Sequence, residues 1–230
     1  MHDELGLGTE KAKIGELMSV QHMWNKALVA ELFFLFLLMP ITLLLPIAII
    51  WQVLAVAAAA FYVLYVMKGQ GLLIKARLLS ANWRELPNRV LLRFSLFIAI
   101  STALMTTLMP EKLFYAVLGN PTLWLAISAF YIIFSVYPQE LLYRLFFFHR
   151  YQPLFSDKRF LLFFNAIIFC YAHLVYLDTL VFALTFVGGV IFANTYQRTK
   201  SVMFTSVEHA LYGWWLYTLG LGEMLAFPGP

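Results

Sequence analysis

From residue 137 the sequence reads Tyr137-Pro138-Gln139-Glu140-Leu141-Leu142-Tyr143-Arg144-Leu145-Phe146-Phe147-Phe148-His149-Arg150. Within six residues of this largely apolar stretch stand an amide, a carboxylate and a guanidinium. On a helix, Glu140 and Arg144 are four residues apart, so they share one face and can form an ion pair. Charged side chains at membrane depth are costly and usually face the interior of a bundle, where they mark function. We therefore expect other helices to meet this stretch at a buried polar site.

The composition predicts an integral membrane protein. The chain has 230 residues, of which 62% are hydrophobic and 12% are charged, and its mean hydropathy is +0.80. A soluble domain carries roughly 25% charged residues. The apolar segments are continuous rather than alternating, which favours helices over barrel strands. The net charge of +4 is explained by cytoplasmic loops, so we expect no nucleic-acid partner.

The apolar segments predict an all-α, polytopic bundle of about seven transmembrane spans, with up to eight helices. A span needs roughly 20 residues. The expected elements are a tight pair of helices in 31–67 turning near Pro46, a short amphipathic surface helix in 68–93, and spans at about 90–109, 121–150, 160–177, 179–196 and 201–221, the fourth helix kinked at Pro138. We expect residues 1–26 to be a cytoplasmic N-terminal segment and residues 27–230 to be one transmembrane domain.

The basic residues predict the orientation of the chain. With the N-terminus in the cytoplasm, all of the 16 Lys and Arg residues except Lys112 and Arg144 lie on the cytoplasmic side. Such a bias is typical of cytoplasmic loops. If the protein is bacterial, we expect it in the inner or plasma membrane. The single cysteine, Cys170, excludes an intrachain disulfide.

Three further ionisable residues lie in the last expected spans, namely His173, Glu208 and His209. At about 1.5 Å per helical residue, Glu140 lies roughly 15 Å from its cytoplasmic marker, His173 roughly 21 Å and His209 roughly 14 Å. We therefore expect Glu140, His173 and His209 to converge in one cavity. Such a set can position and deprotonate a water, either as a base with imidazole support or through a metal. Packing roles for His173 and Glu208, and a purely structural Glu140–Arg144 pair, remain alternatives.

The order and spacing of these residues resemble the CAAX protease and bacteriocin-processing family (CPBP, also called Abi), which includes the Ras-converting CAAX prenyl endopeptidases. That family has the motifs Glu-Glu-x-x-x-Arg, Phe-x-x-x-His and His-x-x-x-Asn on three transmembrane helices. The corresponding segments here are Gln139-Glu140-Leu141-Leu142-Tyr143-Arg144, Phe169-Cys170-Tyr171-Ala172-His173 and His209-Ala210-Leu211-Tyr212-Gly213. The resemblance covers about residues 120–220 and implies an intramembrane endopeptidase acting on a peptide or protein substrate that enters from the cytoplasmic side or from the lipid bilayer.

Two positions depart from the family pattern. The first glutamate, which the resemblance would make the water-activating base, is Gln139, and the final asparagine, an expected donor on the oxyanion side, is Gly213. An amide cannot take up a proton as a carboxylate does. Either Glu140 supplies the base, or Glu208 compensates as an acid, or hydrolysis is lost. Adjacent helical residues point about 100° apart, so Glu140 does not simply replace Gln139.

The resemblance implies a role for each matched residue. Glu140 would be the base or orient it, held by Arg144, while Gln139 contacts the water or the scissile peptide. His173 and His209 would bind the water, a metal or the oxyanion, and Phe169 and Gly213 would lie on the substrate side. Two histidines and a carboxylate are an acceptable Zn²⁺ ligand set. A divalent metal on Glu140, His173 and His209 and a metal-free Glu/His mechanism therefore both stay open.

Two other functions remain alternatives at this point. The first is a catalytically inactive family member that acts as a membrane scaffold or immunity-type binding protein, which Gln139 and Gly213 favour. The second is a small transporter or proton relay built from the same buried groups. The sequence does not predict an oligomeric state.

Overall fold

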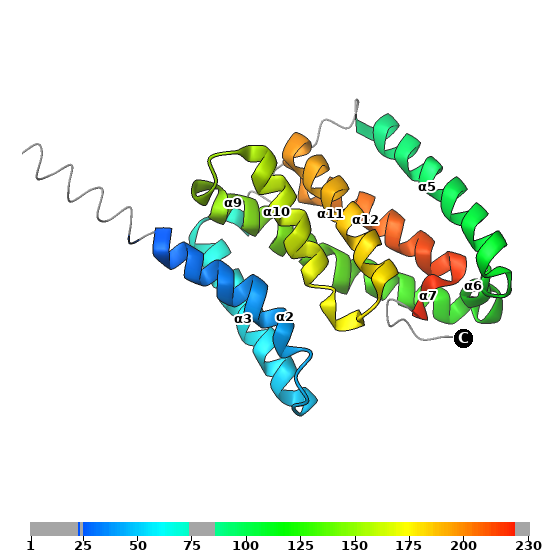
Figure 1. Ribbon diagram of the computed structural model, residues 1–230, viewed down its shortest axis with the longest axis horizontal. Coiled ribbons are helices and arrows are strands. Elements are labelled where there is room, and N and C mark those ends of the chain that lie inside the picture. The colour runs from blue at the N-terminus through cyan, green and yellow to red at the C-terminus, as the bar shows by residue number, and fades with distance from the viewer. Residues whose placement is uncertain (1–22, 24, 74–85, 224–230) are drawn as a thin grey trace, which may run out of the picture.

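The computed structural model describes residues 23, 25–73 and 86–223, and over these residues it contains helices and no strands (Figure 1). Six of the described helices are long and apolar enough to cross a membrane: Asn25–Thr42, Ile49–Gly69, Asn88–Leu108, Pro121–Leu154, Lys158–Tyr176 and Thr179–Thr199. The prediction of an all-α, polytopic membrane protein is thereby confirmed. Residues 74–85, in the middle of the segment 68–93 that was predicted to hold a short amphipathic surface helix, lie outside the described residues.

The first two spans form a hairpin. The first ends in the π-helical η1 (Phe34–Leu38) and in α2 (Met39–Thr42), and the second is α3 (Ile49–Gly69). The connection contains Pro46, as predicted, and the Gln52 side chain donates hydrogen bonds to the carbonyl oxygens of Leu43 and Leu45 at 3.3 and 3.1 Å. Gln52 thus satisfies two carbonyl groups of the turn that have no helical partner.

Three elements follow the hairpin, namely α5 (Leu86–Leu108), η2 (Pro110–Lys112) and α6 (Tyr115–Gly119). One long helix then carries the residues from Tyr137 to Arg150. It consists of α7 (Pro121–Phe130), η3 (Tyr131–Val136), α8 (Tyr137–Glu140), η4 (Leu141–Phe146) and α9 (Phe147–Tyr151). The Asn120 side chain caps it by accepting from the Leu123 N–H at 3.0 Å. Pro138, which lacks an N–H, lies between the π-helical η3 and η4. Such segments are frequent at functional sites.

The chain then turns through η5 (Gln152–Leu154) into α10 (Lys158–Tyr171), η6 (Leu174–Tyr176) and α11 (Thr179–Thr199). Asp157 and Asp178 cap α10 and α11 through backbone N–H groups. The two helices pack closely, since a Cβ added at Gly189 would lie 3.1 Å from the Cα of Ala166.

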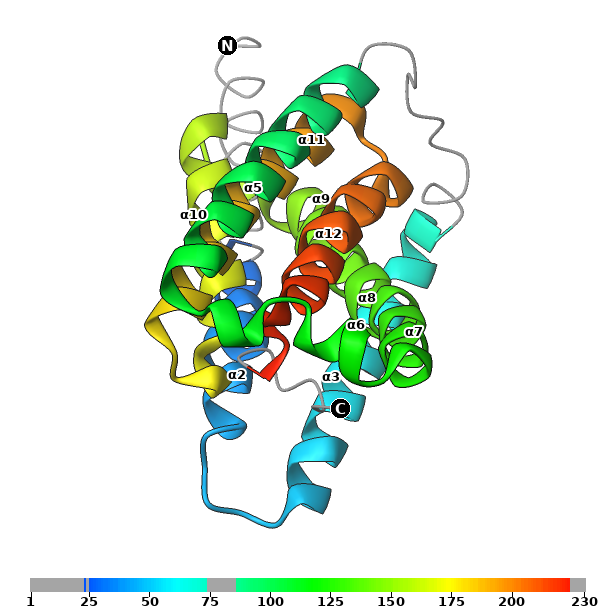
Figure 2. The same cartoon turned by 90° about the vertical axis from the view of Figure 1, so that its right-hand side faces the viewer.

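The last predicted span, 201–221, is helical as α12 (Val202–Leu216) and η7 (Tyr217–Leu221), but it is not among the six apolar spans. It packs against α5, α11 and the long helix and lies in the middle of Figure 2. A helix surrounded by protein does not need a uniformly apolar surface, and α12 carries Glu208 and His209 among its buried residues. Because α12 is buried among other helices, it can be less apolar than they are. Six rather than seven of the described helices are therefore long and apolar enough to cross a membrane.

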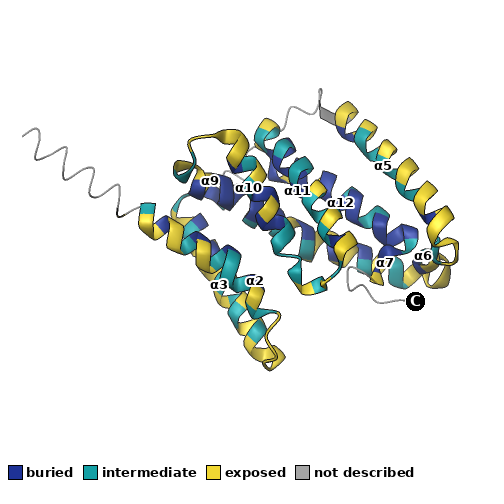
Figure 3. Cartoon of the chain, in the orientation of Figure 1, coloured by how far each residue is buried: buried dark blue, intermediate teal, exposed yellow. Residues whose placement is uncertain are grey.

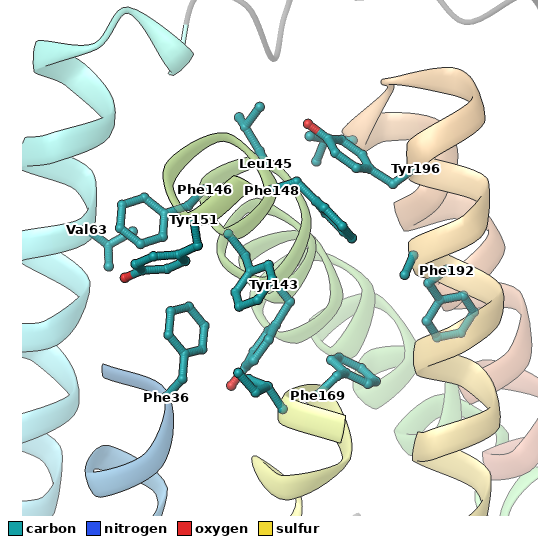
Figure 4. Packing of buried hydrophobic residues seen from close by; sticks show 14 of the residues in the cluster. Phe36, Val63, Tyr143, Leu145, Phe146, Phe148, Tyr151, Phe169, Phe192 and Tyr196 are labelled. Atoms are coloured by element: carbon teal, nitrogen blue, oxygen red, sulfur yellow. The ribbon is translucent and has the colours of Figure 1, made fainter. Parts of the chain in front are cut away.

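Figure 3 shows that buried residues concentrate in α9 to α12, whereas α3 and α5 expose most of their surface. Lipid-facing aromatic side chains account for part of that exposure, for example Phe61 and Tyr65 on α3 at 76% and 78%. The main core is aromatic and joins the hairpin to the long helix (Figure 4). In it, Phe36 makes edge-to-face contacts with Tyr143 and Tyr151, at ring-centroid distances of 5.5 and 5.8 Å.

A polar clamp reinforces this contact. The Glu31 carboxylate binds Arg150 in a bidentate pair at 2.9 and 2.7 Å and also accepts from the hydroxyls of Tyr151 at 2.9 Å and Tyr62 at 2.7 Å. Bidentate Arg–carboxylate pairs are among the strongest hydrogen-bonded contacts in proteins. The clamp therefore connects both helices of the hairpin to α9.

We predict that Glu31→Ala lowers the free energy of unfolding by about 2 kcal/mol, because charge-assisted hydrogen bonds are lost and Arg150 is left without its carboxylate. Thermal unfolding of the purified protein in detergent measures the effect. Glu111→Ala, at an exposed glutamate in η2, is the control and should unfold as the wild type does. Equal melting temperatures for all three proteins would contradict a stabilising clamp.

Candidate functional site

The site is built around Glu140, the last residue of α8, whose side chain is completely buried and contacts α12. One carboxylate oxygen lies 3.3 Å from Nε of Arg144, and the other lies 2.9 Å from Nδ1 of His209. Because an ionised carboxylate only accepts hydrogen bonds, it holds a proton on Nδ1 of His209 and leaves Nε2 of the neutral ring as an acceptor. Glu140 therefore fixes both the orientation and the tautomer of this imidazole.

Arg144 is itself held by α10. Its Nη1 donates to Oδ1 of Asn165 at 2.6 Å, and Nδ2 of Asn165 donates to the carbonyl oxygen of Tyr143 at 2.7 Å. The guanidinium also lies over the ring of Phe169, 4.7 Å from its centroid, where a cation–π attraction contributes. A buried arginine needs several such partners to offset its desolvation.

Sequence reasoning missed Asn165, although a signal was present. Asn165, Phe169 and His173 recur at intervals of four in the sequence, a spacing that a continuous helix would place on one face. In the structure Asn165 and Phe169 lie on α10, and His173 follows its end at Tyr171. An amide in an otherwise apolar span, on the face that carries a site histidine, indicates a supporting role.

The two histidines line one cavity of about 140 Å³, together with Gln139 and Tyr131. The Phe169 carbonyl oxygen accepts from Nδ1 of His173 at 2.8 Å, so the neutral ring keeps its proton there and has Nε2 as an acceptor. His209 stacks on Phe192, with ring centroids 4.5 Å apart. Of the three residues predicted to converge in one cavity, the two histidines line it, whereas Glu140 does not and contacts it only through His209.

Gln139 and Glu140 point in different directions, as adjacent helical residues must. Gln139 lines the cavity, where its Nε2 donates to Oγ of Ser135 at 2.8 Å, and its Oε1 is buried without a hydrogen-bond partner among the described residues. A buried acceptor without a partner is costly and calls for a donor. A bound water or the N–H group of a peptide would supply one.

Glu208 and Gly213 complete the predicted set. Glu208 is fully buried and lies 3.2 Å from Nη2 of Arg93, and it is not among the residues that line the cavity. Gly213 lines the cavity but has no side chain to place there. Glu208 thus joins α12 to α5 through its ion pair with Arg93. The prediction that Glu208 acts as a compensating acid has no support from this geometry, because Glu208 does not line the cavity.

The described residues contain no group of three or more His, Cys, Asp or Glu side chains placed to hold a metal ion. Both oxygens of Glu140 are engaged by Arg144 and His209, so binding a metal there would break one of these contacts. In this arrangement Glu140, His173 and His209 therefore do not fit a metal centre. Binding of a divalent metal by these three residues stays an untested prediction from the sequence.

Fold and site together define a multi-pass membrane protein with a polar site enclosed by its helices. Residues 120–215, somewhat less than half of the chain, match the family model "Type II CAAX prenyl endopeptidase Rce1-like". This match supports the resemblance of this segment to the CAAX protease (CPBP) family. The match contains Glu140, His173 and His209. Neither the comparison with curated proteins nor that with solved structures found a match.

We predict that Asn165→Ala lowers the free energy of unfolding by about 2 kcal/mol, because it leaves a buried guanidinium donor without its acceptor. Asn194→Ala is the matched control, since Asn194 is only part-buried on α11 and its contact to Arg198 is exposed. Denaturation monitored in detergent compares the two. A loss of stability as large in Asn194→Ala as in Asn165→Ala would contradict a special role for Asn165.

Proposed function

We propose that the chain is an intramembrane endopeptidase that hydrolyses a peptide bond in the cavity lined by Gln139, His173 and His209, without a metal. The observation that carries this proposal is the 2.9 Å hydrogen bond between Glu140 and Nδ1 of His209. A buried carboxylate that orients an imidazole and stabilises its protonated form is the arrangement of a general base. Glu140 is thus a positioning residue rather than the base itself.

In the proposed reaction, Nε2 of His209 takes a proton from a water in the cavity while the water oxygen attacks the peptide carbonyl. Glu140 stabilises the imidazolium that forms. His209 then returns this proton to the leaving nitrogen, so that one water is consumed and a carboxylic acid and an amine result. His173 and Oε1 of Gln139 orient the water through hydrogen bonds, which an amide can do although it cannot accept the proton.

The cavity also indicates the kind of substrate. Besides its polar groups, it is lined by Phe97, Leu184 and Ile191, which come from α5 and α11. Apolar walls inside a membrane protein favour apolar side chains beside the scissile bond. We therefore propose a hydrophobic peptide or protein segment as the substrate.

A first experiment reconstitutes the protein in lipid with a peptide library and follows cleavage by mass spectrometry. General acid–base groups contribute about 10²- to 10⁴-fold, so we expect His209→Ala to lower kcat at least about 100-fold. Glu140→Gln should lower kcat by a comparable factor, since the imidazolium loses its counter-charge. His149→Ala, at an exposed histidine on the same long helix, should cleave as the wild type does. A wild type that cleaves no library member would overturn the proposal.

A second candidate function is a family member that binds peptides without cleaving them, and the amide of Gln139 favours it. The variant Gln139→Glu separates the candidates, because it places a carboxylate at the cavity. For a binding protein, we expect the wild type to retain labelled peptide intact, and Gln139→Glu to show cleavage. For the proposed endopeptidase, the wild type itself cleaves, and Gln139→Glu changes the pH profile of kcat by adding a titrating group to the cavity.

A further inference from the structure

We propose that an apolar groove between the N-terminal hairpin and the long helix binds a side chain of the substrate and thereby determines which peptide bonds are cleaved; this inference rests on the proposed endopeptidase function. The groove has a volume of about 340 Å³, and its walls come from η1, α2 and α3 on one side and from α8 and η4 on the other. Figure 1 shows this hairpin at one edge of the bundle. The hairpin lies outside the matched residues 120–215, so the family match does not describe this wall.

The groove adjoins the cavity of the proposed reaction at two points. Gln139 lines both the groove and the cavity, and Ala172, which also lines the groove, directly precedes His173 in the cavity. The Oε1 atom of Gln139 is buried and has no hydrogen-bond partner in the described part of the chain. A peptide backbone that passes Gln139 can donate an N–H group to this oxygen, whereas the acyl chain of a lipid has no donor. The junction therefore favours a peptide occupant.

The lining of the groove favours apolar side chains. Among the described residues that line it, only Gln139 and Tyr143 carry a polar side-chain group. A charged substrate side chain would find no partner there, whereas an apolar one would bury its surface. Met39 and Met67 also line the groove, and their flexible thioethers adapt to side chains of different shapes. We therefore expect a large apolar residue, such as Leu, Met or Phe, at one substrate position beside the scissile bond.

The room in the groove depends on two alanines of α3. Ala59 and Ala60 line it together with Val56 and Val63, at the spacing of three and four residues that places side chains on one helix face. The groove can be entered from the lipid, because Val56 and Leu64, which both line it, are each 45% exposed. A bulky side chain in place of either alanine would occupy the space that we assign to the substrate.

The test uses the reconstituted protein and the same peptide library, and compares the residues found around the cleaved bonds. For the wild type we expect, at one position, a preference for Leu, Met or Phe over Ala of about 10-fold or more in kcat/KM, which is the scale that hydrophobic pockets achieve. In Ala59→Phe this preference should fall below about 3-fold, because the groove is filled, while peptides with Ala at that position are still cleaved. A purely structural defect would lower the cleavage of all peptides alike.

Ala58→Phe is the matched control, because Ala58 is the exposed neighbour of Ala59 on α3 and does not line the groove. It adds the same side chain to the same helix and should keep the wild-type preference. Melting temperatures in detergent identify a variant that fails to fold. If Ala59→Phe does not fold, Ala60→Leu replaces it as a smaller change that also fills the groove.

A crosslinking measurement locates the substrate without relying on turnover. Cys170→Ala removes the single cysteine of the chain, and Ala60→Cys then places a thiol in the groove. The probe is a library peptide that the wild type cleaves, synthesised with one cysteine at the selected position. With copper phenanthroline as the oxidant, we expect a disulfide between this peptide and Ala60→Cys, and none with Ala58→Cys, whose thiol faces away from the groove.

The outcomes separate the two proposals. If the wild type cleaves and Ala59→Phe keeps its residue preference, the role of the groove is overturned while the proposed function stands. An equal loss of preference in Ala58→Phe overturns it in the same way. If native mass spectrometry shows that Ala59→Phe loses a bound phospholipid and its peptide preference is unchanged, the groove holds lipid and the inference is wrong. A wild type that cleaves nothing overturns the endopeptidase and the role of the groove together.

Discussion

The structure depends on one buried carboxylate and the two groups that hold it. Glu140 has lost its water, and Arg144 on one side and His209 on the other replace that hydration. Asn165 extends the network to a third helix. Removing any partner would leave a polar group unpaired in a medium that cannot solvate it. The long helix, α10 and α12 are therefore joined at one point for electrostatic reasons, and the cavity lies beside that point.

Much of the fold follows from the sequence because a bilayer permits few solutions. Long apolar segments predicted the helices, Pro46 predicted the hairpin connection, and no strands occur among the described residues. Counting residues along helices also placed Glu140 and His209 at similar depths, since the helical rise per residue is constant. The number of apolar spans was less predictable, because α12 is surrounded by protein and its residues need not suit lipid.

The directions of side chains could not be predicted in the same way. The sequence shows that Gln139 and Glu140 point apart, but only the packing of the helices decides which of them faces the cavity. The charge distribution assigns Arg93 to a cytoplasmic segment, whereas the structure places it in α5 and pairs it with Glu208. Such contacts join residues more than a hundred positions apart, and spacing along the chain carries no information about them.

The spacing of Glu140 and Arg144 on one helix also bears on how the protein enters the membrane. Each helix of a multi-pass protein must pass from the insertion machinery into lipid, and an isolated charge makes that transfer costly. Because the two opposite charges lie four residues apart on the same segment, the long helix brings the counter-ion of Glu140 with it, and this pair enters as a neutral unit. His209 can follow on α12 as an uncharged ring. The charged core of the site is thus half assembled during biosynthesis, before the last helix is made.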